Sequence, residues 1–114
     1  MALSSVLDNI VIVLDSPKNV VNIANVIRVM MNMGLSQLRL VNPEEYDVHR
    51  ITGIAHRSDE LAKSVKVFHS LTDALADTVF AVGTTARPRT AQRNYIRPRS
   101  AAPIIIDKAT EGPV

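Results

Sequence analysis

A single arginine is conspicuous in the stretch NVVNIANVIRVMMNMG, because Arg28 is the only charged residue between Asn19 and Leu38. If the stretch is a helix, three asparagines share an arc of roughly 120° with that arginine, namely Asn22, Asn25 and Asn32. A solvent-facing stripe more often carries Lys and Glu pairs. The composition therefore suits a face covered by a ligand, a loop or another subunit. An exposed stripe that is merely uncharged is the alternative, and Asn22 alone has a second interpretation as a local cap.

A second group of polar residues follows the apolar run TVFAV. Gly83 permits close backbone approach, and the hydroxyls and amides of Thr84 and Thr85 can meet the polar edge of a ligand. Between Arg87 and Arg99 the chain holds five arginines and no acid, at Arg87, Arg89, Arg93, Arg97 and Arg99. Such a local positive field suits phosphates. A solvated, arginine-rich loop without a partner is the other interpretation.

Composition limits the class of protein. With 114 residues, 46% of them hydrophobic, and a net charge of +2, residues 1–114 are expected to form a single globular domain. Cysteine is absent, which excludes disulfides, thiolate metal sites and cysteine nucleophiles and fits a reducing cytoplasm. No other metal-binding pattern is present. No stretch approaches the ~20 apolar residues of a membrane span, so we expect a cytoplasmic protein with no membrane partner.

Hydrophobic runs and turn signals predict the elements that position these residues. Strands are expected at residues 10–14, 37–43, 65–70 and 78–84, and helices at 20–33, near 58–64, within 70–77 and within 100–112. Residues 44–64 are otherwise polar and mixed. Alternation of strands and helices predicts an α/β fold, with a mainly parallel sheet and helices on both faces. Ligands of such sheets bind at the carboxyl ends of strands, and no glycine-rich dinucleotide fingerprint is present.

The residues that carry this pattern also resemble a known family. NIVIVLDSPKNVVNIANVIRVMMNMGLSQLRLVNP, LTDALADTVFAVGTTARPR and RPRSAAP are similar to the SpoU/TrmH-type RNA 2′-O-ribose methyltransferases of the SPOUT superfamily, closest to the TrmJ-like tRNA branch. The resemblance covers residues 9–114. Asn22 and Arg28 match the Asn-x5-Arg motif of that family.

The resemblance implies an S-adenosylmethionine-dependent enzyme that methylates a ribose 2′-hydroxyl in RNA, with tRNA favoured over rRNA, and that works as a homodimer. It implies a catalytic role for Arg28 with Asn22 as its companion, and a cofactor-lining role for Thr84, Thr85, Ala86 and the adjoining Gly83. It also assigns RNA backbone contact to the arginines between positions 87 and 99. A non-catalytic α/β module that binds RNA or dimerises is the competing interpretation.

Departures from the family pattern lead to further expectations. Ala24 replaces a usual glycine, which puts tight helix packing there in question. His56 and Arg57 replace small residues, and His56, like His49 and His69, is interpreted as a polar loop residue. The second and third family motifs, which supply most of the cofactor pocket and a knot, are not among these 114 residues. We therefore expect an N-terminal portion of a SPOUT methyltransferase domain that is inactive by itself.

Overall fold

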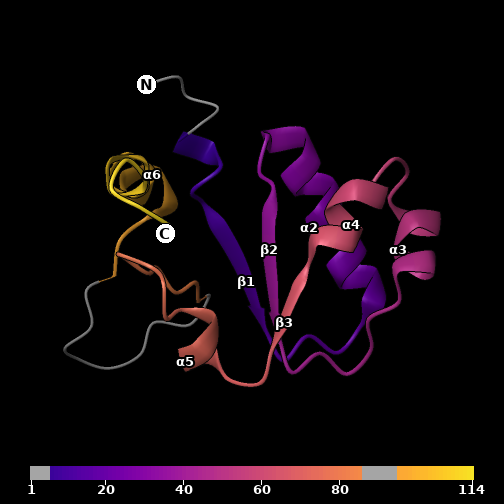
Figure 1. Cartoon of the computed structure of the whole chain (residues 1–114). Helices are drawn as coiled ribbons and strands as arrows, with labels where there is room; N and C mark the ends of the chain where they lie inside the picture. The colour runs from indigo at the N-terminus through magenta and orange to yellow at the C-terminus, as the bar shows by residue number, and fades with distance from the viewer. Residues whose placement is uncertain (1–5, 86–94) are drawn as a thin grey trace.

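The computed structural model describes residues 6–85 and 95–114 and shows strands and helices alternating along the chain (Figure 1). The elements are β1 (Val11–Asp15), α2 (Val20–Met33), β2 (Gln37–Val41), α3 (Val48–Ile54), α4 (Asp59–Ser64), β3 (Lys66–Phe68), α5 (Leu71–Ala74) and α6 (Pro98–Ala109). The predicted α/β class is confirmed.

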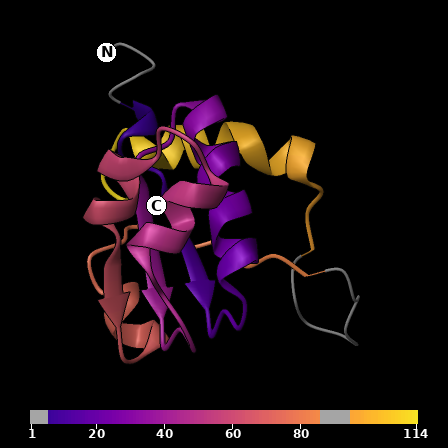
Figure 2. The same cartoon turned by 90° about the vertical axis from the view of Figure 1, so that its right-hand side faces the viewer.

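The three strands form one parallel sheet in the order β1-β2-β3. Val11 is opposite Gln37, and Arg39 is opposite Lys66. Helices α2, α3 and α4 lie on one face of the sheet, and α5 and α6 lie on the other (Figures 1 and 2). The carboxyl ends of all three strands therefore lie at the same edge of the sheet, as the predicted topology requires.

Helix α2 forms because its ends and its apolar spacing agree. The side chain of Asn19 caps the first turn by accepting from the backbone N–H of Val21 at 2.8 Å, and Gly34 closes the helix with φ of 75°. Asn22 therefore is not the cap. Ile23, Ile27 and Met30, each buried, recur at helical spacing and pack into the main core.

Ala24 fits this core without difficulty. Its side chain has an exposed fraction of 0%, and it belongs to the same cluster as Leu38 and Leu40 of β2. The methyl group that replaces the usual hydrogen of glycine is accommodated at the helix–sheet contact. The tight helix packing that the sequence put in question at Ala24 is therefore present.

The predicted strand at residues 78–84 is wrong. These residues are irregular, and the backbone N–H of Val79 donates to Pro113 at 2.8 Å. Val114 donates to Asn9 at 2.9 Å and accepts from Val11 at 2.8 Å, so the C-terminal residues lie beside β1. A strand needs a hydrogen-bonded neighbour along its length. In the described part of the chain, Val79 is the residue of this segment whose backbone N–H donates to a distant carbonyl.

The helices also differ from the sequence prediction in extent. Helix α3 was not predicted; Asp47 caps it by accepting from the N–H of His49 at 2.9 Å. Helix α6 begins at Pro98, where a missing N–H costs nothing, and it continues through Pro103. The predicted helix near residues 58–64 is confirmed as α4. Among the described residues no helix is long and apolar enough to cross a membrane.

Candidate functional site

Arg28 lies on the exposed side of α2, as the helical wheel predicted. Asn22, Asn25 and Asn32 are also exposed on this helix. Within residues 6–85 and 95–114 the guanidinium of Arg28 has no hydrogen bond or ion pair. An exposed, unpaired guanidinium keeps all its donors free for a ligand.

An open pocket of about 480 Å³ surrounds this guanidinium. Its lining residues are Arg28, Met31, Asn32, Ile54 and His56. Arg28 and Asn32 are one helical turn apart on α2, whereas Ile54 and His56 come from the end of α3 and the turn after it. Of these residues none is acidic, so the pocket favours an anion or a polar group with partial negative charge.

The pocket includes only part of the predicted catalytic pair. Asn22 is six residues before Arg28 on α2 and does not line the pocket, while Asn32 does. His56 was interpreted as an ordinary loop residue, yet it is part of the pocket wall. No local signal identified it, because the contact depends on how α3 packs against α2.

The predicted cofactor segment lies elsewhere in the chain. Gly83, Thr84 and Thr85 are exposed and irregular, and they do not line the pocket around Arg28. Figure 1 shows that the chain after α5 runs on the side of the sheet opposite α2. Ala86 lies outside the described residues. Within one chain, therefore, Arg28 and the threonine pair are not brought together.

Two of the five predicted RNA-binding arginines can be placed. Arg97 and Arg99 are both exposed at the start of α6, where Arg97 is the N-cap residue. Arg87, Arg89 and Arg93 lie outside the described residues. In the described part of the chain no group of three or more His, Asp, Glu or Cys side chains could hold a metal ion.

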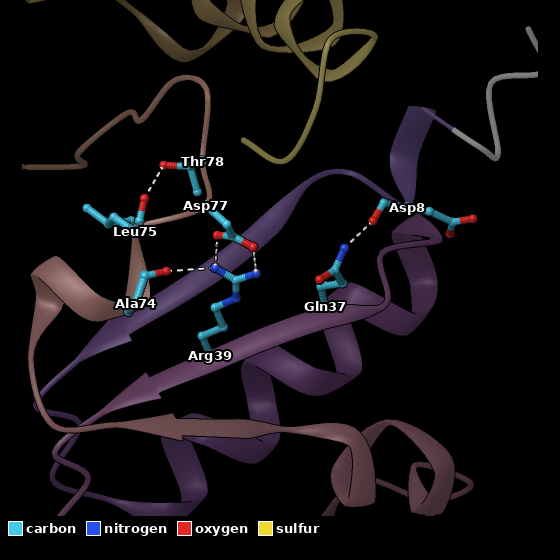
Figure 3. A network of polar contacts seen from close by, with 7 residues as sticks. All are labelled: Asp8, Gln37, Arg39, Ala74, Leu75, Asp77 and Thr78. Atoms are coloured by element: carbon cyan, nitrogen blue, oxygen red, sulfur yellow. Dashed lines mark hydrogen bonds and ion pairs between the residues drawn. The ribbon is translucent and has the colours of Figure 1, made fainter.

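A second polar cluster, which the sequence did not suggest, is centred on Arg39 of β2 (Figure 3). This buried guanidinium, 5% exposed, donates to both carboxylate oxygens of Asp77 at 2.6 and 2.8 Å and to the carbonyl of Ala74 at 2.7 Å. Its Cζ atom is 5.7 Å from the centre of the Phe68 ring. The hydrogen bond from Arg39 lowers the pKa of Asp77, and the same bond raises the pKa of Arg39.

This cluster has a structural task that bears on the site. Asp77 stands just before the irregular segment that leads to Gly83, and Ala74 ends α5. By joining both to the middle strand, Arg39 fixes the start of the segment on the sheet. Because its charge is already matched, Arg39 is a poor candidate for binding a substrate.

The parallel sheet and the cationic pocket define an α/β protein with a polar site on a helix face. The sequence profile of the SpoU rRNA methylase family matches residues 9–106. That match spans most of the chain, and the protein therefore belongs to the SpoU rRNA methylase family.

Individual relatives agree with this assignment. The chain is 34% identical over 101 residues to the uncharacterized tRNA/rRNA methyltransferase LasT of Escherichia coli K12, covering 89% of this chain and 44% of that protein. It is 34% identical over 108 residues to the tRNA (cytidine/uridine-2′-O-)-methyltransferase TrmJ of Sodalis glossinidius, covering 95% of this chain and 42% of that protein.

A solved structure shows the same fold. The crystal structure of TrmJ from Z. mobilis ZM4 superimposes with a TM-score of 0.79 at 31% identity, over 85% of this chain and 44% of the other. The fold thus agrees with the SPOUT-like architecture that the resemblance implied. The chain spans less than half the length of these relatives.

Proposed function

We propose that this chain is the substrate-activating part of an RNA 2′-O-ribose methyltransferase that uses S-adenosylmethionine as methyl donor, with tRNA as the preferred RNA. The observation that carries the proposal is the exposed guanidinium of Arg28, which has no partner among the described residues and lies in a pocket without acidic lining residues. Membership of the SpoU family and similarity to proteins named as tRNA 2′-O-methyltransferases support it. We propose a cytoplasmic location, in keeping with a tRNA substrate.

The chemistry explains why an arginine is needed. A ribose hydroxyl is a poor nucleophile, and negative charge grows on its oxygen as the new O–CH₃ bond forms and the sulfonium S–CH₃ bond breaks. The Arg28 guanidinium stabilises that charge electrostatically. Loss of one such donor typically costs about 3 kcal/mol of transition-state stabilisation. The hydroxyl proton passes to another acceptor, such as a substrate phosphate, because the guanidinium of an arginine stays protonated and does not act as a general base.

We assign one wall of the methyl donor's site to Gly83, Thr84 and Thr85. S-adenosylmethionine supplies the methyl group when bound, and its adenosine and amino-acid portions carry many polar atoms. The exposed backbone of Gly83 and Thr84 offers donors and acceptors to such a ligand, and a Cβ added at Gly83 would meet no atom of the described residues within 4 Å. These residues form one side of a site and do not enclose it, so we propose that the 114-residue chain alone transfers little or no methyl group.

Two further surfaces complete the proposal. Arg97 and Arg99, with the arginines at 87, 89 and 93, contact the RNA backbone and hold its register. Helix α2 packs against a second copy of the chain, because its exposed side presents Val29 (56% exposed) and Met33 (64% exposed) beside neutral asparagines. A homodimer can bring Arg28 of one subunit to the threonine pair of the other.

The test is Arg28→Ala in the full-length gene product, assayed for methyl transfer to tRNA and for cofactor affinity. A loss of about 3 kcal/mol corresponds to a fall in transfer rate of roughly 100-fold, with cofactor affinity kept. Unchanged transfer would refute the proposal. A non-catalytic RNA-binding module would instead change only in RNA affinity, and a dimerisation module only in oligomeric state.

Subunit mixing tests the composite site. Arg28→Ala subunits and Gly83→Val subunits, each inactive alone, are unfolded and refolded together. If each site uses residues from both subunits, the mixture regains about a quarter of normal activity, because half of the dimers are mixed and each has one intact site. If mixing restores nothing, the site does not cross the subunit boundary.

A further inference from the structure

The turn between α3 and α4 holds His56 against the Arg28 pocket in a defined way. Ala55 ends α3 in an extended conformation, and Arg57 has a φ of 64°, which is unusual for a residue with a side chain. Ser58 is 1% exposed, and its hydroxyl donates to the carbonyl of Ala55 at 2.5 Å. A buried hydrogen bond therefore closes the turn around His56, so the imidazole does not belong to a freely moving loop.

The pocket is lined by both hydrogen-bond donors and apolar side chains. Arg28, Asn32 and His56 supply guanidinium, amide and imidazole N–H groups, while Met31 and Ile54 supply apolar surface. A volume of about 480 Å³ lies within the usual range for ligand sites. A phosphate joined to a ribose suits such a mixed lining, because it combines charged oxygens with a carbon framework.

The other two described histidines are placed differently. His49 is exposed in the first turn of α3, and His69 is exposed just after β3, where its backbone carbonyl accepts from Asn42 at 2.9 Å. Neither of these residues lines the pocket.

We propose that His56 contacts the RNA substrate directly. Together with Arg28 it binds a backbone phosphate next to the ribose that is methylated. The identity of the ligand as RNA rests on the proposed function; the pairing of His56 with Arg28 in one pocket does not. His56 strengthens substrate binding, and Arg28 in addition stabilises the reacting oxygen. A single-stranded or bulged segment is the favoured RNA, because its unpaired nucleotides are accessible to side chains.

The first experiment observes the three imidazoles by NMR in the 114-residue chain. A short single-stranded ribo-oligonucleotide is titrated in, with inorganic phosphate titrated separately. The proposal expects the His56 resonances to shift with the oligonucleotide while those of His49 and His69 stay constant. A shift with phosphate alone, no weaker than with the oligonucleotide, would show a simple anion site and overturn the RNA assignment. Oligonucleotide binding that leaves His56 unchanged would overturn it as well.

The second experiment compares His56→Gln with the matched control His49→Gln in the full-length gene product. We expect His56→Gln to raise the KM for tRNA about 5- to 10-fold, with kcat within about twofold, because a charge-assisted contact to the bound substrate is lost. His49→Gln should leave both constants unchanged. An unchanged KM overturns the proposal, as does a change in oligomeric state at constant RNA affinity, which would mean that a second subunit covers the pocket.

The two proposals can fail separately. If Arg28→Ala keeps full methyl transfer while His56 still responds to RNA, the catalytic assignment fails and the RNA-binding pocket stands. If Arg28→Ala abolishes transfer while His56→Gln has a normal KM, the catalytic assignment stands and the role of His56 fails.

Discussion

Replacing Asp77 by asparagine measures how strongly the Arg39 cluster holds the fold together. The substitution removes the carboxylate that accepts two hydrogen bonds, at 2.6 and 2.8 Å, from a guanidinium that is only 5% exposed. Removing the partner of a buried charge costs up to 3–5 kcal/mol. The Asp77 side chain is itself 56% exposed, so solvent screens the pair and compensates part of the loss. We therefore expect the free energy of unfolding to fall by about 1–2 kcal/mol.

The measurement is urea denaturation followed by far-UV circular dichroism, since the chain has no tryptophan. Asp73→Asn is the matched control, because Asp73 is also an exposed acid of the α5 region and its side chain has no ion pair in the described structure. At unchanged m-value, the midpoint of Asp77→Asn should lie clearly below that of Asp73→Asn. Equal midpoints would show that the cluster contributes nothing to stability and would refute the reasoning.

Two further predictions concern pH and backbone conformation. Because Arg39 lowers the pKa of Asp77, the stabilisation is present above the unfolded-state pKa of ~3.9 and is lost as pH falls through the lower folded-state pKa. The stability difference between wild type and Asp77→Asn should therefore shrink below about pH 4. A constant difference down to pH 2 would contradict this. Gly34→Ala should destabilise the folded protein by about 1 kcal/mol because φ at this position is 75°. Gly53→Ala, with open space around the added methyl group, should stabilise α3 by up to ~1 kcal/mol. The reverse order of melting temperatures in thermal melts would be inconsistent with the structure.

The sequence predicted those elements whose signals are local. Helix α2 could be bounded because Gly34 marks its end by its own backbone preference and its apolar positions repeat at helical spacing. β1 and β2 were recognisable as short β-branched or alternating runs bounded by turn residues. Each of these features depends on neighbours within a few residues, so a single sequence is enough to read it.

Other features depend on residues far apart in the chain. Residues 78–84 have the composition of a strand, but strand formation requires a paired neighbour, and Val79 finds one in Pro113 alone among the described residues. Arg39 and Asp77 are separated by 38 positions. His56 joins Arg28 through the packing of α3 on α2. None of these contacts leaves a periodic signal in the sequence, so each required the fold.

The contrast between two arginines shows why charge alone does not identify a site. Arg39 lies in the middle strand, where it is buried and its charge is matched by Asp77. Arg28 lies on a helix of neutral residues and is exposed with no partner in the described structure. A guanidinium whose charge is matched within the fold stabilises the fold, and its donors are occupied. An unmatched guanidinium keeps its donors for a ligand. The sequence context of Arg28, a helix with no acid within reach of i±4, already predicted the second case.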